Sequence, residues 1–243
     1  MMNKLVSRFN LSNSGVFLKF IRYNLKIVFG NKFVYFLGAS LIFYFLITSI
    51  SLFAADSVSV EGVYFQLMFP AFLLIFFPTT YGIQNDEDAR ILEILFGIPD
   101  YRYKIWLVRL LMAFFMVFWF LFIMANMSSV LLINVPIWEM TLRLMVPVML
   151  FGMLGFFFST VVKNGNGTAV IVVIIGLLVW FISAFLEESP WNVFLNPFEL
   201  PSNMSEIVWE SIVAKHMRTW LIVSLVAGLW GLLNLQKREK FIK

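Results

Sequence analysis

The sequence predicts an all-α protein that crosses a membrane six times. Three observations support this fold class. Six long apolar runs occur within 243 residues, and each can form a helix that satisfies its own backbone hydrogen bonds in hydrocarbon. The chain is 61% hydrophobic and only 13% charged, whereas a soluble domain has about 25% charged residues. The basic residues also gather in alternate connections between the runs, as they do in polytopic membrane proteins.

Each apolar run has the length of a membrane-spanning helix. About 20 helical residues cross the ~30 Å hydrocarbon core of a bilayer. Within a single transmembrane domain over residues 1–243, the predicted spans are 33–55, 63–83, 105–125, 141–162, 168–186 and 219–235. The connections between them are too short to form enzymatic domains, so we expect function to reside in the membrane or at its two faces.

The Lys and Arg residues predict that both termini lie in the cytoplasm. If the N-terminus is inside, all 18 basic residues except Arg143, Lys215 and Arg218 fall on the inner side. An even number of spans then returns the basic C-terminus to the same side. The outer connections are acidic instead, with Asp56, Glu61, Glu139, Glu187, Glu188, Glu199, Glu206 and Glu210.

A basic amphipathic segment precedes the first span, within the cytoplasmic stretch 1–32. Lys19, Arg22 and Lys26 share one face of a helix drawn over residues 15–32, and apolar residues occupy the opposite face. This pattern predicts a helix that lies in the headgroup layer of membrane lipids. Two roles fit it: an anchor that fixes the topology, or a lever that contacts a cytoplasmic partner.

The cytoplasmic loop 84–104 is the most distinctive connection. Acidic residues at 86–88 favour the start of a helix, and Gly97 and Pro99 mark its end. Between them, apolar residues recur at helical spacing at Ile91, Ile94, Leu95 and Ile98. We expect one short helix over 84–99 whose apolar stripe is covered either by the chain's own helix ends or by a groove on a soluble partner.

The long outer connection, 187–218, is rich in aromatic residues and has an apolar stretch in its first half. It predicts re-entrant or interfacial helices, one of them from Met204 to Met217. The residues expected to form an outer gate are Trp191, Phe194, Pro197 and Phe198. The alternative is an outer lid without a gating role.

The sequence has no motif for catalysis by this chain alone. It lacks a phosphate-binding loop of the form G-x-x-x-x-G-K-[ST], and neither G-x-S-x-G nor H-E-x-x-H occurs. It contains one His and no Cys, which leaves too few ligands for a zinc site. No span has an acidic residue near its middle, which disfavours an ion-coupled carrier. We therefore expect no enzymatic activity, no metal, no cofactor and no nucleic-acid partner.

The order of these parts resembles the ABC-2 type permeases, the membrane subunits of ATP-binding-cassette exporters. The resemblance covers the layout of the whole chain: a basic interfacial helix, six spans, a short acidic and apolar helix after the second span, and outer re-entrant helices before the sixth. At residue level it is carried by Glu87-Asp88-Ala89-Arg90-Ile91-Leu92-Glu93-Ile94-Leu95-Phe96-Gly97-Ile98-Pro99, followed by Tyr101-Arg102.

The resemblance implies a permease that pairs with a second copy or a paralogue and with two cytoplasmic ABC ATPase subunits, which bind ATP and Mg. It also implies a multi-pass location in the plasma (inner) membrane of a bacterium. The helix 84–99 would be the coupling helix. The implied ATPase-contacting residues are Glu87, Arg90, Ile91, Glu93, Ile94, Leu95, Phe96, Pro99 and Arg102, together with Lys19, Arg22 and Lys26 of the N-terminal helix.

Two other functions remain open from the sequence. A membrane-embedded enzyme, such as a lipid-modifying transferase, would need polar catalytic groups clustered at one depth. A permease-like scaffold subunit of a larger envelope complex would have the same layout as an exporter. Genomic adjacency to an ATPase gene separates the membrane enzyme from an exporter permease, and a transport assay separates the scaffold subunit.

Overall fold

The computed structural model describes residues 33–53, 58–97 and 100–236, and within these ranges it contains helices and no strands. Six helices are long and apolar enough to cross a membrane, which confirms the all-α, six-span prediction. The spans are α2 (Phe33–Phe53), α3 (Val60–Thr80), η1 with α6 (Arg102–Leu107 and Val108–Leu131), α7 (Ile137–Val162), α8 (Gly165–Ser183) and α9 (Glu206–Asn234). The predicted helix over 15–32 lies outside the described residues.

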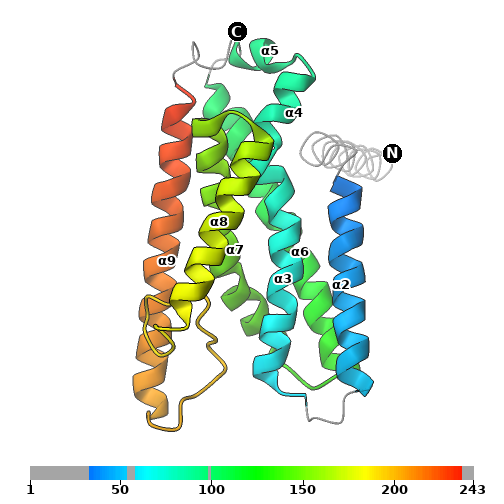
Figure 1. The fold of residues 1–243 in the computed structure, drawn as a ribbon, viewed down its shortest axis with the longest axis vertical. Coiled ribbons are helices and arrows are strands. Elements are labelled where there is room, and N and C mark those ends of the chain that lie inside the picture. The colour runs from blue at the N-terminus through cyan, green and yellow to red at the C-terminus, as the bar shows by residue number, and fades with distance from the viewer. Residues whose placement is uncertain (1–32, 54–57, 98–99, 237–243) are drawn as a thin grey trace, which may run out of the picture.

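Two short helices, α4 (Gly82–Asp88) and α5 (Leu92–Gly97), follow α3 at one end of the bundle; in Figure 1 α4 lies level with the upper end of α9, and α5 lies beyond it. This end is called the α4–α5 end below. The opposite end has the connection between α8 and α9. Residues 184–205 form turns there in place of the expected re-entrant helices. The expected separate helix from Met204 to Met217 is instead the first part of α9, which continues without interruption into the sixth span.

Helix α7 is the centre of the bundle. It contacts α3, α6, α8 and α9, while α2 packs at the edge against α3 and touches α6. Figure 1 shows this order, with α2 and α9 on opposite sides of the molecule. Because α7 touches most of the other spans, 61% of its apolar window is buried, compared with 17% for α2 and 22% for α8. Most residues in the apolar windows of α2, α8 and α9 are therefore not buried by the rest of the chain.

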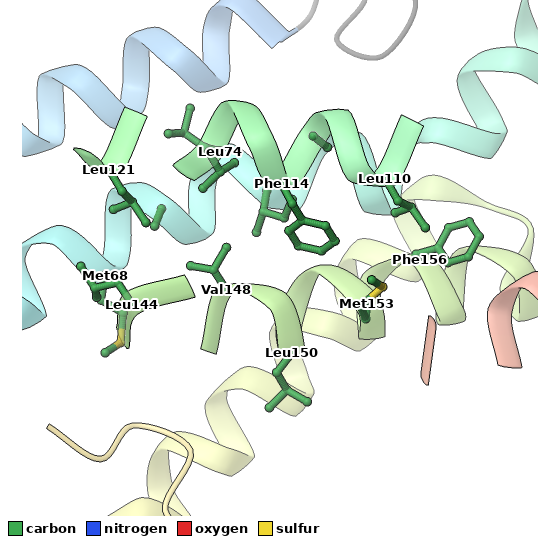
Figure 2. Close-up of a cluster of buried hydrophobic side chains, with 14 of the residues drawn as sticks. Met68, Leu74, Leu110, Phe114, Leu121, Leu144, Val148, Leu150, Met153 and Phe156 are labelled. Atoms are coloured by element: carbon green, nitrogen blue, oxygen red, sulfur yellow. The ribbon is translucent and has the colours of Figure 1, made fainter. Parts of the chain in front are cut away.

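The core lies between α3, α6 and α7. Figure 2 shows side chains from these three helices meeting around Phe114 and Val148. Lipid offers helices no hydrophobic driving force to associate, so close packing across small residues has to supply it. Gly152 of α7 is such a position: a Cβ atom built on it would lie 2.7 Å from Ile75 of α3 and 2.8 Å from Phe114 of α6.

Buried polar side chains join the peripheral helix α2 to its neighbours. The Tyr44 hydroxyl donates to the carbonyl of Met124 at 3.1 Å and lies 3.0 Å from the Ser128 hydroxyl. The amide of Gln66 donates to Thr48 at 2.6 Å. These four polar residues therefore form hydrogen bonds between helices, as expected in hydrocarbon where water cannot replace the partner. Other polar residues of the spans, such as Thr141 and Ser224, donate instead to a carbonyl of their own helix.

Candidate functional site

The predicted coupling segment is two helices rather than one. The break falls at Arg90, whose φ of 55° places it in the left-handed region. The Arg90 amide donates to the carbonyl of Glu87 at 2.9 Å, and the Ile91 amide donates to that of Asp86 at 3.1 Å. This pair of bonds is the Schellman motif that closes a helix. Glycine usually occupies the left-handed position, and because Arg stands there no residue type in the segment indicates the break.

The break divides the apolar residues of this segment into buried and exposed ones. Leu92 and Phe96 of α5 are buried in the core cluster, and the Phe96 ring meets Tyr101 edge to face with centroids 5.0 Å apart. Ile94 is 68% exposed on the same short helix. The buried residues are therefore not those of the predicted stripe: Ile91 and Leu95 are half-buried, and Ile94 is exposed to another molecule.

A buried ion pair holds α4 to the third span. Arg109 of α6 donates through Nη1 to Oδ2 of Asp86, and the two side chains are only 13% and 7% exposed. The Arg109 guanidinium also lies 5.0 Å from the ring centroid of Trp106. Burial raises the pKa of the Asp86 carboxyl, and the positive charge of Arg109 opposes that rise. The charged form of Asp86 therefore depends on Arg109.

The turn between α7 and α8 is clamped onto α4. The Gly165 amide donates to the side-chain oxygen of Gln84, and the Tyr81 hydroxyl donates to Asn166 at 3.2 Å. A Cβ atom at position 165 would lie 2.5 Å from both Gln84 Oε1 and Tyr81 Cδ1. The first residue of α8 is therefore in direct contact with α4, and only glycine permits so close an approach to Gln84 and Tyr81.

The end of α9 also joins this site. The Tyr101 hydroxyl, at the start of the third span, donates to the carbonyl of Leu235. Asn234 donates to the Thr160 hydroxyl of α7 at 3.3 Å. With the amide of Gln236 oriented to place its oxygen toward Arg102, that oxygen accepts from Arg102 Nη2 at 3.2 Å. The α4–α5 end is thus connected to α6, α8 and α9.

We expect Gly165→Ala to loosen α4 from α8. The added methyl group must displace the Tyr81 ring and remove the Gln84 hydrogen bond, which costs about 1–3 kcal/mol for overpacking a tight contact. Limited proteolysis of the segment after α4 in nonionic detergent measures the loosening. Gly97→Ala is the matched control, because a Cβ atom there would meet nothing within 4 Å. Equal cleavage of both variants and the parent protein would show that the clamp does not hold α4.

The predicted outer gate residues belong to a buried irregular segment at the opposite end. Phe194 is 7% exposed and stacks on Phe151 of α7 with centroids 5.8 Å apart, and Trp180 of α8 meets it edge to face at 5.3 Å. Asn196 donates to the carbonyl of Glu61 at 3.1 Å. The segment is therefore inserted between α3, α7 and α8.

Polar contacts secure the second half of this segment. The Pro197 carbonyl accepts from Arg143 of α7 at 3.1 Å and from the Trp209 indole of α9 at 3.3 Å. The Arg143 guanidinium also lies 5.1 Å from the Phe198 ring centroid, and it pairs with Glu139. Trp191 is 57% exposed and stands apart from these contacts. Arg143 is thus a structural clamp for the 192–198 segment.

The described site residues fall into two groups at the two ends of the bundle. The α4–α5 end contains Glu87, Arg90, Ile91, Glu93, Ile94, Leu95, Phe96 and Arg102. The opposite end contains Trp191, Phe194, Pro197 and Phe198. Lys19, Arg22, Lys26 and Pro99 lie outside the described residues.

Sequence reasoning missed the residues that connect α4 to the bundle. The helical pattern assigns Asp86 only a helix-starting charge, and no pattern indicates that Gly165 contacts Gln84. One signal was available: Arg109 is a basic residue a full helical turn inside the third span, where an unpaired charge is costly. Comparisons with family models, curated proteins and solved structures find no match for this chain.

Proposed function

We propose that this chain is the permease subunit of an ABC exporter and that α4 and α5 receive the motion of a separate cytoplasmic ATPase. The observation that carries the proposal is the attachment of these short helices to the spans. They stand outside the bundle, and yet Asp86 is ion-paired to α6 and Gln84 is hydrogen-bonded to the start of α8. The resemblance of residues 87–99 to the ABC-2 permeases supports the same function.

The physical argument concerns how a soluble motor can act on a membrane pathway. A soluble protein reaches only elements that project from the bilayer. The α4–α5 end provides such an element, and its contacts reach three spans through Arg109, Gly165 and Leu235. A displacement of α4 would therefore act directly on α6 and α8, and a displacement of α5 would reach α9 through Phe96, Tyr101 and Leu235.

The proposal places the α4–α5 end in the cytoplasm of a bacterium, beneath the inner membrane. The ATPase binds ATP and Mg, and a second copy or a paralogue of this chain completes the pathway. The charges of the two ends are consistent with this orientation. The positive-inside rule counts Lys and Arg: among the described residues the α4–α5 end includes Arg90, Arg102, Lys104, Arg109 and Lys163, and the opposite half includes Arg143, Lys215 and Arg218. Acidic residues occur at both ends and do not enter this count.

Ile94→Asp should uncouple the ATPase without disturbing the fold. Ile94 is 68% exposed, so a carboxylate is tolerated in the free permease but costs binding in an apolar groove of the partner. The measurement is the amount of ATPase that co-purifies in mild detergent and its ATP hydrolysis rate. We expect both to fall several-fold.

Ile207→Asp is the matched control, since Ile207 is 81% exposed at the opposite end. It should leave the co-purified ATPase unchanged. Equal yields of ATPase with both variants would contradict the coupling role of α5. If no ATPase accompanies the parent protein when it is expressed with its neighbouring genes, the exporter function itself is refuted.

A further inference from the structure

An apolar groove runs along the lipid-facing side between α3 and α8. Its volume is about 520 Å³, within the usual range of small-molecule sites. The lining residues are carbon-rich side chains, among them Phe69, Phe72, Phe76, Val173 and Leu177. Phe65 and Phe76 of α3 both line it and are eleven residues apart, so the groove is ~16 Å long at 1.5 Å per residue. This length and lining suit a single hydrocarbon chain.

A second, polar groove of about 730 Å³ lies at the end of the bundle opposite α4 and α5. Glu187, Glu188 and Glu199 line it, and none of the described residues that line it is Lys, Arg or His. Asn192 lines it as well and is 7% exposed. The Asn192 oxygen accepts from the Phe194 amide at 3.0 Å, while its amide nitrogen donates no hydrogen bond to any described residue. The polar groove is therefore lined by negative charge, and the Asn192 amide nitrogen in its wall can donate a hydrogen bond to a ligand.

The two grooves adjoin. Phe65, Trp180 and Phe194 line both of them, so the apolar groove and the acidic one meet at these three aromatic side chains. The junction is aromatic, with Trp180 and Phe194 meeting edge to face. An aromatic face attracts a cation in addition to offering apolar contact.

We infer that the two grooves together form one binding site for a single-chain amphiphile with a cationic head group. The hydrocarbon chain occupies the groove between α3 and α8, and the head group occupies the acidic groove against Glu187, Glu188 and Glu199. A head with an oxygen beside its positive charge also accepts from the Asn192 amide. An anionic head would face three carboxylates without a compensating basic residue in the wall.

The same observations favour an amphiphile over a helix of a second copy. A membrane helix could cover the apolar groove, but it would leave the adjoining acidic groove empty, although the two grooves share three lining residues. As an assignment of transported substrate, this inference rests on the proposed function. As a binding site it does not, because both grooves are present in the chain alone.

The test is photo-crosslinking of the purified full-length protein in nonionic detergent. Three probes share one dodecyl chain with a diazirine near its end and differ in the head: a primary amine, an alcohol and a carboxylate. We expect the amine to label α3 and α8 more strongly than the other two, by roughly threefold to tenfold, as one or two partly exposed charge pairs would produce. Peptide mass spectrometry locates the label.

Two pairs of variants separate the head site from the tail site. The first pair tests the head site. A triple variant that carries Glu187→Gln, Glu188→Gln and Glu199→Gln should lose the preference for the amine. A double variant that carries Glu206→Gln and Glu210→Gln alters the neighbouring groove and should retain that preference. Gly176→Leu should block labelling by all three probes because its side chain fills the apolar groove. Gly176→Ala should not, since its Cβ would lie 3.6 Å from Phe151, an ordinary contact. Thermal unfolding verifies that each variant is folded.

Several outcomes would overturn the inference. Equal labelling by the three probes would show a slot for ordinary lipid chains without head-group selection. Crosslinks between two copies of α8 in place of probe labelling would show that a second copy fills the groove. Amine-selective labelling in a protein that recruits no ATPase would support the binding site and refute the exporter function, so the two failures are distinguishable.

Discussion

Arg109→Gln should destabilise the protein by about 3–5 kcal/mol, the usual cost of removing one partner from a buried ion pair. The loss is large because Asp86 would remain in place, 7% exposed and without its cation. Thermal unfolding in nonionic detergent, followed by circular dichroism, measures the effect. Lys104→Gln is the control: Lys104 pairs with Asp100 at 3.6 Å, both side chains are more than 60% exposed, and such pairs contribute less than about 1 kcal/mol.

The pH dependence of the Arg109→Gln variant gives an independent check. Burial raises the pKa of Asp86, and without Arg109 nothing among its charged partners opposes that rise. In this variant the folded carboxyl holds its proton at a pH where the unfolded carboxyl has lost it, so stability falls as pH rises through the raised pKa. The loss in free energy of unfolding relative to the parent protein should be larger near neutral pH than at mildly acidic pH. A loss that does not change with pH would contradict this account of Asp86.

Gly152→Leu should have the second large effect, because it places a bulky side chain where three helices meet. Even a Cβ atom would lie 2.7 Å from Ile75 and 2.8 Å from Phe114, so α7 must move away from α3 and α6. Overpacking a tight core costs about 1–3 kcal/mol or more, and in a bilayer the loss of close packing also removes the main attraction between helices. Thermal unfolding and the yield of monodisperse protein in detergent measure it.

Gly38→Leu is the matched control for Gly152→Leu. Gly38 also lies within a membrane-spanning helix, α2, but a Cβ atom there would meet nothing within 4 Å. It should change the unfolding temperature little, and a gain from better helix propensity is the expected direction. If the two variants unfold at the same temperature, close approach at Gly152 is not what holds α7 against α3 and α6.

The sequence predicted correctly the membrane-spanning helices, which depend on composition averaged over about 20 residues. The six apolar runs predicted six helices because hydrocarbon permits few other backbone arrangements, and the six helices are present. The prediction was less accurate for local ends of helices. The Schellman turn at Arg90 has no glycine to mark it, and residues 187–203 resemble helix in composition but form turns that Asn192 and Asn196 close with their own side chains.

The sequence by itself determined that this protein is helical and that six of its helices have the length and apolar character to cross a membrane, because these properties follow from averages over about 20 residues. Only the tertiary structure decided which polar residues meet. Asp86 and Arg109 are 23 positions apart, and Gln84 and Gly165 are 81 apart. Such pairs depend on how helices are placed around α7, which no local pattern encodes. The same placement sets an apolar groove beside an acidic one, with Phe65, Trp180 and Phe194 in the walls of both.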